Sequence, residues 1–361
     1  MILFLHNRYR NAGGEEQSLE NLIWLVRERL GEDAQLLERD SADLSRAAAA
    51  RSLLTGGIDP QEVFDQVRRS GARVLHAHNI HPAFGWRALA AGRAAGARVI
   101  LHLHQYRLVC AVGVCFTNGA ECTRCHGRNT TPGVLRNCRG DRAEALVYAA
   151  SLAGWQRRIA ASVDAFVVPS AFAATRLGEL GAPVSGPHVV PHPLREIAER
   201  AAPRREGYAL FVGRLEPEKG LDVAIEACRR EGLPLVVAGA GSERSRFEGT
   251  PGISFVGAVD QAELARLRAG AGVAVMPSLF AETFGLAAAE AMAAGLPVVA
   301  SRIGALPEIL PTGWLVPPGD ATALAAALAR LRGDREAGEL GLARSREMLA
   351  TAQSALAAVY S

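Results

Sequence analysis

The chain has 361 residues, and 49% of them are hydrophobic, which is enough to fill the cores of two ordinary domains. Its net charge of +3 at pH 7 is too small to indicate nucleic-acid binding, although it permits a basic site for a diphosphate or contact with an anionic membrane surface. No segment approaches the ~20 apolar residues that span a bilayer. The apolar start MILFLH lacks the features of a signal peptide, so we interpret it as a first strand and expect a cytoplasmic protein.

Short apolar runs alternate with helical stretches along the whole chain. Most runs are continuously apolar, as in parallel strands that are buried on both faces. Strands are predicted at residues 2–6, 34–38, 73–78, 98–104, 165–169, 208–212, 233–238, 253–256, 272–276 and 297–300. Helices such as Glu16–Arg29 and Leu221–Arg230 lie between them. This alternation predicts the α/β class, with two Rossmann-like, doubly wound domains facing each other across a cleft.

A polar, charged segment near residues 195–206 separates the two groups of strands. We therefore place the first domain at residues 1–195 and the second at residues 206–340. Residues 106–141 form an insertion in the first domain that is rich in Cys, Gly, Thr and Arg and has little periodicity. A final helical stretch could pack on either domain, and we expect residues 341–361 to return to the first.

Polar residues follow several of the predicted strands at their carboxyl ends, where ligands bind in open parallel sheets. They are His6 and Asn7, His78 and Asn79, His104 and Gln105, Ser170, Gly213 and Arg214, and Ser278. A structural hydrogen bond is the ordinary role of any one of the histidines. Their shared placement favours a site.

The segment from Ala281 to Ser301 carries the strongest functional pattern. A loop follows a strand, and a helix begins near Gly285 and ends at Gly295, a residue type suited to a helix end. The amides of Phe284, Gly285 and Leu286 are therefore predicted to lie at a helix N-terminus. Such a terminus favours a bound diphosphate.

Two glutamates belong to the same segment. Glu282 lies just before the helix and Glu290 lies about a turn and a half inside it, so one carboxylate could reach a sugar and the other a ribose. An ordinary capped amphipathic helix is the alternative interpretation. It explains Glu290 poorly, because the neighbouring residues are almost all alanine and a buried glutamate needs a partner.

A second pattern surrounds Lys219, the only lysine in the chain. Arg214 and Lys219 flank a glycine turn between a strand and a helix, where they would neutralise a pyrophosphate. In isolation this segment would be better explained as a solvated basic loop. Gly13 and Gly14, which follow the first strand, would let the backbone approach a phosphate closely, although any tight turn could use such a pair.

Five of the six cysteines lie in the insertion. Cys110, Cys122, Cys125 and Cys138 have a spacing compatible with a structural zinc site that would tie the loop together. Reduced thiols packed in a loop are an equal alternative, and an iron–sulfur cluster is a less favoured one. Cys115 could replace Cys110 as a ligand.

The order of these segments resembles that of the family 4 glycosyltransferases of the GT-B fold. The resemblance rests on the glutamate pair with seven intervening residues, followed by GLPVVAS and PEIL. It implies that Glu282 contacts the donor sugar and Glu290 the ribose. It also implies that Arg214 and Lys219 bind the diphosphate, that Gly14 belongs to a loop over the phosphates, and that His104 lies near the reacting centre. The chain departs from the family pattern at Pro191-His192-Pro193, where a proline-asparagine turn is usual.

A subgroup that serves bacterial surface polysaccharide or glycoconjugate assembly is more similar still, through LHNRYRNAGGEEQ, LHQYRLVC and NCRG. Gln105 and Ala111 depart from it. Family 4 implies a retaining enzyme of hexosyltransferase type, with front-face attack by an acceptor hydroxyl as the diphosphate leaves. No metal or other cofactor is required for that reaction. The expected partners are a UDP- or GDP-sugar and a carbohydrate or lipid-linked acceptor, with peripheral contact at the inner membrane face.

Other function classes fit the sequence less well. Another GT-B enzyme, an epimerase or a sugar phosphorylase, is the nearest alternative. The phosphorylase would need a lysine for a pyridoxal cofactor, and Lys219 is the only candidate. A zinc-containing nucleic-acid-binding protein conflicts with the weak charge and few aromatic residues. The first strand-to-helix turn lacks the G-x-G-x-x-G pattern of a nicotinamide dehydrogenase.

Overall fold

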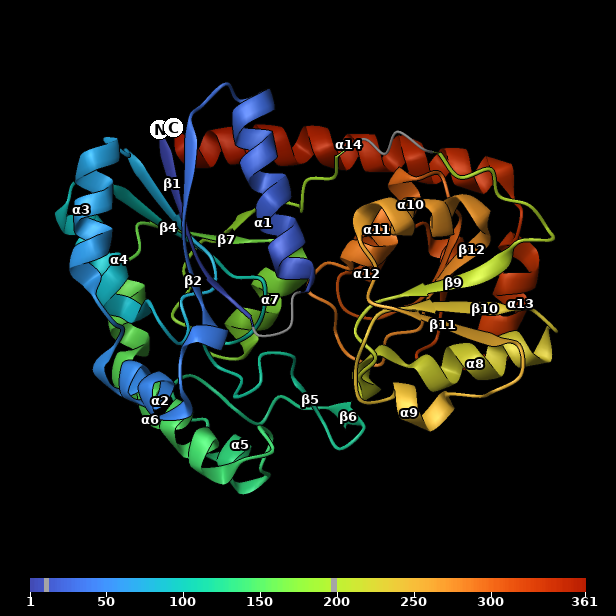
Figure 1. The fold of residues 1–361 in the computed structure, drawn as a ribbon, viewed down its shortest axis with the longest axis horizontal. Coiled ribbons are helices and arrows are strands. Elements are labelled where there is room, and N and C mark those ends of the chain that lie inside the picture. Colours follow the sequence, from blue (N-terminus) through green and yellow to red (C-terminus); the bar gives the residue numbers. More distant parts are fainter. Residues whose placement is uncertain (10–12, 196–199) are drawn as a thin grey trace. The chain divides into compact units, whose positions relative to one another are not determined.

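The structure is a computed structural model that describes residues 1–9, 13–195 and 200–361. The chain divides into two compact units (Figure 1). Unit 1 comprises Met1–Thr117, Cys122–Pro193 and Thr351–Ser361, and unit 2 comprises Asn118–Glu121 and Leu194–Ala350. Each unit contains one six-stranded sheet with helices packed on it.

The sheet of unit 1 has the strand order β2-β1-β3-β4-β7-β8, and its neighbouring strands pair in parallel. Its strands are β1 (Ile2–Arg8), β2 (Ala34–Asp40), β3 (Val74–Ala77), β4 (Arg98–His102), β7 (Ala165–Val168) and β8 (His188–Val189). The helices are α1 (Gly14–Trp24), which continues as a π-helical turn over Leu25–Arg29, α2 (Arg46–Thr55), α3 (Pro60–Ser70), α4 (Gly85–Ala94), α5 (Thr131–Leu135), α6 (Arg142–Ala161) and α7 (Ala171–Glu179). The predicted insertion contains the short strands β5 (Phe116–Thr117) and β6 (Ala120–Glu121).

The sheet of unit 2 has the order β11-β10-β9-β12-β13-β14, again with parallel neighbours. Its strands are β9 (Tyr208–Val212), β10 (Leu235–Ala238), β11 (Ile253–Gly257), β12 (Ala271–Met276), β13 (Val298–Ser301) and β14 (Leu315–Val316). The helices are α8 (Leu221–Arg230), α9 (Arg244–Phe247), α10 (Gln261–Gly270), α11 (Leu286–Ala293), α12 (Leu306–Ile309) and α13 (Ala321–Leu331). In chain order the strands run 3-2-1-4-5-6, which is the order of dinucleotide-binding domains.

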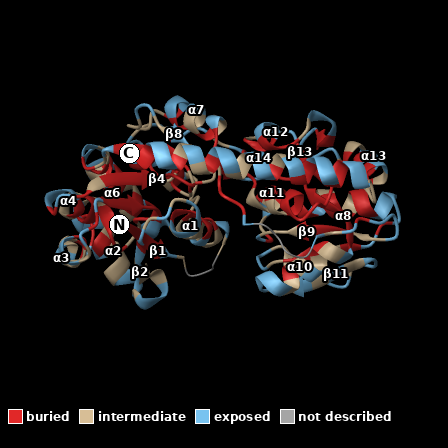
Figure 2. Cartoon of the chain, turned by 90° about the horizontal axis from the view of Figure 1, so that it is seen from above, coloured by how far each residue is buried: buried red, intermediate tan, exposed pale blue. Residues whose placement is uncertain are grey.

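Burial explains why these segments form parallel strands. The central strands are buried along their length, as in β12, whose six residues are all inaccessible, because helices cover them (Figure 2). The predicted α/β class with two doubly wound sheets is confirmed, as is the helix at Leu221–Arg230. The sequence did not indicate β8 or β14, two-residue strands at the sheet edges.

The last helix, α14 (Arg335–Tyr360), ends in unit 1. The guanidinium groups of Arg73 and Arg98 donate hydrogen bonds to the carbonyl oxygens of Tyr360 and Val359. These bonds use carbonyls at a helix C-terminus that have no acceptor role inside the helix, and they fix the end of α14 to unit 1. None of the helices in the described part of the chain is long and apolar enough to cross a membrane.

Candidate donor and acceptor sites

In open parallel sheets, ligands bind outside the carboxyl ends of the strands at the point where the strand order reverses. In unit 2 this switch point lies between β9 and β12, and in unit 1 it lies between β1 and β3. Most of the predicted site residues follow these strands or their neighbours. The two switch points are therefore the candidate sites.

The loops that follow β9 and β12 contact each other closely in unit 2. The amide of Leu279 donates a 2.8 Å hydrogen bond to the carbonyl of Glu218. Gly220 has a φ of 68°, and a Cβ placed on it would lie 2.1 Å from the carbonyl oxygen of Pro277. Only glycine fits this close approach, and it brings the neighbouring lysine to the other loop.

Lys219 and Glu282 form the ion pair at this point. The ammonium Nζ lies 2.8 Å from Oε1 of Glu282, and Ser278 donates a 2.6 Å hydrogen bond to the same oxygen. The ammonium also lies 4.6 Å from the ring centroid of Phe280. Because an ammonium has three N–H donors, this pair leaves Lys219 with donors to offer a ligand.

Arg214 occupies the start of the same loop. Its guanidinium donates a 2.9 Å hydrogen bond to Glu218, and its side chain is 48% exposed. Glu218 is largely buried, but nearly half of the arginine side chain is accessible, so its other N–H donors can reach a ligand. The guanidinium of Arg214 can therefore donate hydrogen bonds to a bound anion without disturbing the fold of unit 2.

The head of α11 adds backbone donors next to Glu282. Gly285 is the N-cap residue of α11, with a φ of 101°. Because glycine has no side chain, it makes no capping hydrogen bond to the first turn of the helix. The intrahelical bonds begin at Ala288, which donates to the carbonyl of Gly285 at 3.0 Å. The amides of Leu286 and Ala287 consequently have no acceptor within the helix. Phe284 precedes the cap and is buried.

Inside α11, Glu290 forms an ion pair that the sequence did not indicate. The guanidinium of Arg268, on α10, lies 2.5 Å from Oε2 of Glu290 and is 3% exposed. Burial raises the pKa of Glu290, and the neighbouring arginine partly offsets this effect. The requirement for a partner was predictable. Its identity was not, because Arg268 lies in a separate amphipathic helix where an arginine normally faces solvent.

At the switch point of unit 1, the predicted glycine loop leads into α1. Gly13 is the N-cap and Gly14 the first helical residue. The carboxylate of Glu16 accepts hydrogen bonds from the amides of Gly13, at 2.8 Å, and Tyr9, at 3.2 Å. Burial opposes ionisation of Glu16, but the imidazole of His6, whose Nε2 lies 3.8 Å from Oε1, and the hydrogen bonds from these amides lower its pKa. Residues 11 and 12 of the predicted loop lie outside the described residues.

His104 lies two residues beyond β4, among other histidines. Its Nε2 is 2.7 Å from Nδ1 of His78, and its ring stacks on that of His102 with 4.2 Å between centroids. The ring of His192 stacks on that of His104 too, at 5.1 Å, and also lies 5.9 Å from that of His102. Burial, and then the neighbouring histidines, hold the pKa of His104 well below its ordinary value. The imidazole is therefore neutral near pH 7 and offers one donor and one acceptor rather than a charge.

Together with His6 and His76, these side chains form a group of six buried histidines. From the sequence we grouped His6, His78 and His104 at the strand ends and missed His76 and His102. The signal was present in the patterns His-Ala-His at 76–78 and His-Leu-His at 102–104. Residues two apart in a strand point to the same face of the sheet.

All six cysteines are free thiols. A hydrogen bond with Cys115 lowers the pKa of Cys110 to about 6. Within residues 1–9, 13–195 and 200–361, two groups of three metal-ligating side chains have ligand atoms within 4.8 Å of one another. Both groups consist of histidines, and no cysteine belongs to either. The zinc site at Cys110, Cys122, Cys125 and Cys138 accordingly stays a prediction.

Comparisons with known proteins agree with this architecture. Residues 17–193 match the family model described as "Glycosyl transferase 4-like domain", and residues 206–334 match "Glycosyl transferases group 1". A phosphatidyl-myo-inositol mannosyltransferase of Mycobacterium leprae is 40% identical over 154 residues, which are 37% of this chain. The chain spans 41% of the length of that curated relative.

Two solved structures resemble the chain over nearly its whole length. A sucrose-phosphate synthase from Thermosynechococcus elongatus is 19% identical with a TM-score of 0.71, and covers 99% of this chain and 98% of its own. The Anabaena protein HepE, in complex with UDP-glucose, is 17% identical with a TM-score of 0.64 and the same coverage. Because the two family matches account for both α/β units and the fold likeness extends through both, the chain belongs to the group 1, family 4-like glycosyltransferases and has the GT-B fold.

Proposed function

We propose that the chain transfers a sugar, with retention of anomeric configuration, from a nucleotide-diphosphate donor to a hydroxyl group of an acceptor. One observation carries the proposal. In unit 2 the ammonium of Lys219 contacts Glu282 at the switch point of the sheet, and α11, whose first amides have no acceptor within the helix, begins shortly after Glu282 in the chain. A diphosphate placed there meets both a charge and free backbone donors.

The diphosphate is assigned to Lys219, Arg214 and the head of α11. Each cation already has a carboxylate partner, which keeps the site neutral when no donor is bound. Both cations retain N–H donors for phosphate oxygens, and the amides of Leu286 and Ala287 have no acceptor within the helix. As the bond to the sugar breaks, these groups stabilise the negative charge that develops on the leaving phosphate.

The sugar and the ribose are assigned to the two glutamates. Both hydrogen bonds that Glu282 accepts from described residues reach Oε1, which supports a role for Oε2 in binding a sugar hydroxyl. Arg268 engages Oε2 of Glu290 and thereby fixes the orientation of that carboxylate. Its other oxygen is then placed to accept from the ribose hydroxyls.

Unit 1 is assigned the acceptor side, with His104 as a neutral hydrogen-bonding residue at the reacting centre and Gly13 and Gly14 in the loop near the phosphates. The acceptor oxygen bonds to the anomeric carbon on the face that the diphosphate leaves. The bond between that carbon and the phosphate oxygen breaks. The acceptor proton passes to the leaving phosphate oxygen, so no metal or second nucleophile is required.

The HepE complex with UDP-glucose supports a uridine donor, and a guanosine donor remains the alternative. The mycobacterial relative acts, by its name, on a phosphatidyl-inositol lipid, which supports a lipid-linked acceptor in surface polysaccharide or glycoconjugate assembly. We further propose a cytoplasmic protein that touches the inner membrane face through α5 and α6. Leu135 and Leu146 on these helices are 76% and 61% exposed. Unchanged sedimentation with anionic vesicles after Leu135→Asp and Leu146→Asp would rule out this contact.

A melting-temperature screen with UDP, GDP and their sugars tests the donor. A ligand at 100 times its dissociation constant stabilises the folded protein by about 2.7 kcal/mol. We expect one nucleotide series to raise the melting temperature and the other to have little effect. If no nucleotide or nucleotide sugar shifts the transition, the proposed function is wrong.

A further inference from the structure

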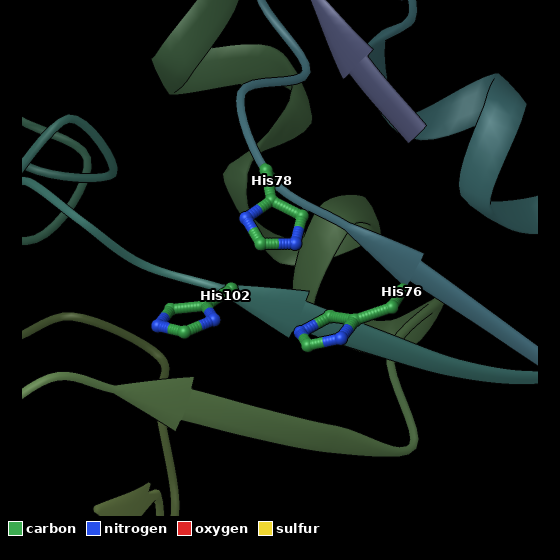
Figure 3. A group of neighbouring side chains, drawn as sticks. All are labelled: His76, His78 and His102. Carbon is green, nitrogen blue, oxygen red and sulfur yellow. The ribbon is translucent and has the colours of Figure 1, made fainter. Parts of the chain in front are cut away.

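Three histidines at the end of adjacent strands in unit 1 form a compact group that the transfer reaction does not use. His76 and His78 come from β3 and the residue after it, and His102 ends β4 (Figure 3). The register pairs Ala77 with Leu101, so His78 lies beside His102. Because alternate residues share a face, all three side chains project from the same side of the sheet.

These rings are deeply buried, with exposures of 0% for His76, 3% for His78 and 2% for His102. Among the described residues, neither ring nitrogen of His102 has a hydrogen-bond partner, and nor does Nε2 of His76 or His78. Leaving a buried polar atom without a partner costs about 1–3 kcal/mol. The rings stack on one another, but stacking gives these nitrogens no hydrogen-bond partner, so the fold accepts this cost at three neighbouring positions.

The unpartnered nitrogens face one another. The ligand atoms of the three residues lie within 4.8 Å of one another, and each ring has a nitrogen on the side that faces the other two (Figure 3). The rings stack at interplanar angles of 35°, 9° and 30°, so metal–nitrogen bonds of ~2.0–2.1 Å to one central ion require the rings to rotate until each lone pair points at that ion.

Two further contacts resemble the outer shell of a metal site. Nδ1 of His76 is 2.7 Å from the hydroxyl oxygen of Tyr360, and Nδ1 of His78 is 2.7 Å from Nε2 of His104. When each Nδ1 carries the proton and donates it, each Nε2 presents a lone pair to the group. Metal-binding histidines are oriented in this way by a partner at the second nitrogen.

We propose that His76, His78 and His102 bind one zinc ion or a similar divalent transition-metal ion through neutral imidazole nitrogens. Imidazole is a ligand type that suits these ions. The ion would tie the ends of β3 and β4 together and fix His78, which contacts His104. His192 belongs to a second group, with His102 and His104, whose ligand atoms also lie within 4.8 Å of one another. The site is structural and separate from the diphosphate, which belongs to unit 2.

The test uses the full chain with Cys122→Ser, which removes one ligand of the predicted cysteine site. The protein is stripped with a chelator, incubated with zinc chloride and dialysed, and its zinc content is measured. We expect one zinc ion per chain, retained by the exposed-histidine control His188→Gln and lost in His102→Gln. Tyr360→Phe, which removes an outer contact, should lower zinc affinity by about 10–100-fold.

X-ray absorption of the zinc-loaded chain with Cys122→Ser gives a readout that does not depend on the folding of the histidine variants. Nitrogen neighbours with the pattern of coordinated imidazole support the proposal. Sulfur neighbours, absence of zinc from the parent chain, or full zinc content in folded His102→Gln would each overturn it. The measurement needs no donor or acceptor, so its outcome is independent of the proposed transferase function.

Discussion

The two units place different chemistry at the switch points of similar sheets. All nine histidines lie in unit 1, whereas the only lysine lies in unit 2. At the unit 2 site, opposite charges are paired, as in Lys219 with Glu282. The corresponding region of unit 1 holds buried, neutral rings. This difference supports the proposal that a phosphate binds in unit 2, where these cations lie, whereas unit 1 offers neutral rings beside the carboxylate of Glu16.

The largest expected effect comes from removing the charge of unit 2 at Lys219. In Lys219→Ala the leaving diphosphate loses its ammonium partner and Glu282 loses its cation, so we expect transfer to fall by at least about 10²–10³-fold. Initial rates with the nucleotide sugar found in the melting screen measure this. Lys219→Arg retains the charge in a different geometry and should be impaired less. Full activity in Lys219→Ala would show that the charge of unit 2 has another purpose.

The ion pair of Glu290 and Arg268 separates the function of the unit 2 site from its stability. Substituting either residue should lower the stability by a similar amount, but only the substitution of Glu290 should weaken nucleotide binding. Either Glu290→Gln or Arg268→Gln leaves a buried charge without its partner, which costs about 3–5 kcal/mol. Only Glu290→Gln replaces the carboxylate proposed to bind the ribose with a neutral, weaker amide acceptor, so we expect about tenfold weaker nucleotide binding there, or about 1.4 kcal/mol. Calorimetric titration and melting curves measure both. Equal affinity losses in the two variants would mean that Glu290 acts through the fold alone.

Acid should destabilise the protein through unit 1. Burial lowers the pKa of His76 and of His192 from 6.5 to about 3. The unfolded chain therefore takes up these protons first, and the free energy of unfolding decreases as pH falls from 6.5 towards 3. The slope is up to about 1.4 kcal/mol per pH unit for each histidine. Urea unfolding of chelator-treated protein measures it.

The matched variants for this effect are His192→Gln, which should flatten the pH dependence, and His188→Gln at an exposed position, which should leave it unchanged. Both are compared with the parent chain between pH 7.5 and 5. An identical slope in all three proteins would contradict the description of unit 1 as a neutral, buried site.

Much of the fold was predictable, because strands that are buried on both faces of a sheet consist of consecutive apolar residues. Continuous apolar runs identified ten of the strands, and the glycine turn before α8 fixed the start of that helix. The edge strands β8 and β14 were not predictable, since two residues at a sheet edge carry no periodicity. Their pairing depends on a neighbouring strand rather than on their own composition.

The site was predictable in its residue types and less so in its contacts. The glycines that flank the helix predicted that α11 begins near Gly285, and in the structure it begins at Leu286. The bond between Lys219 and Glu282 joins residues 63 apart in the chain, and local pattern says nothing about such a distance. The same holds for the histidines of β3 and β4, which meet only because the two strands are neighbours in the sheet.

A crystal of the protein soaked with the nucleotide sugar that stabilises it would show where the diphosphate binds. We expect phosphate oxygens against the amides at the head of α11 and within hydrogen-bonding distance of Nζ of Lys219. A nucleotide bound elsewhere, with that helix terminus closed off by protein atoms, would contradict this expectation.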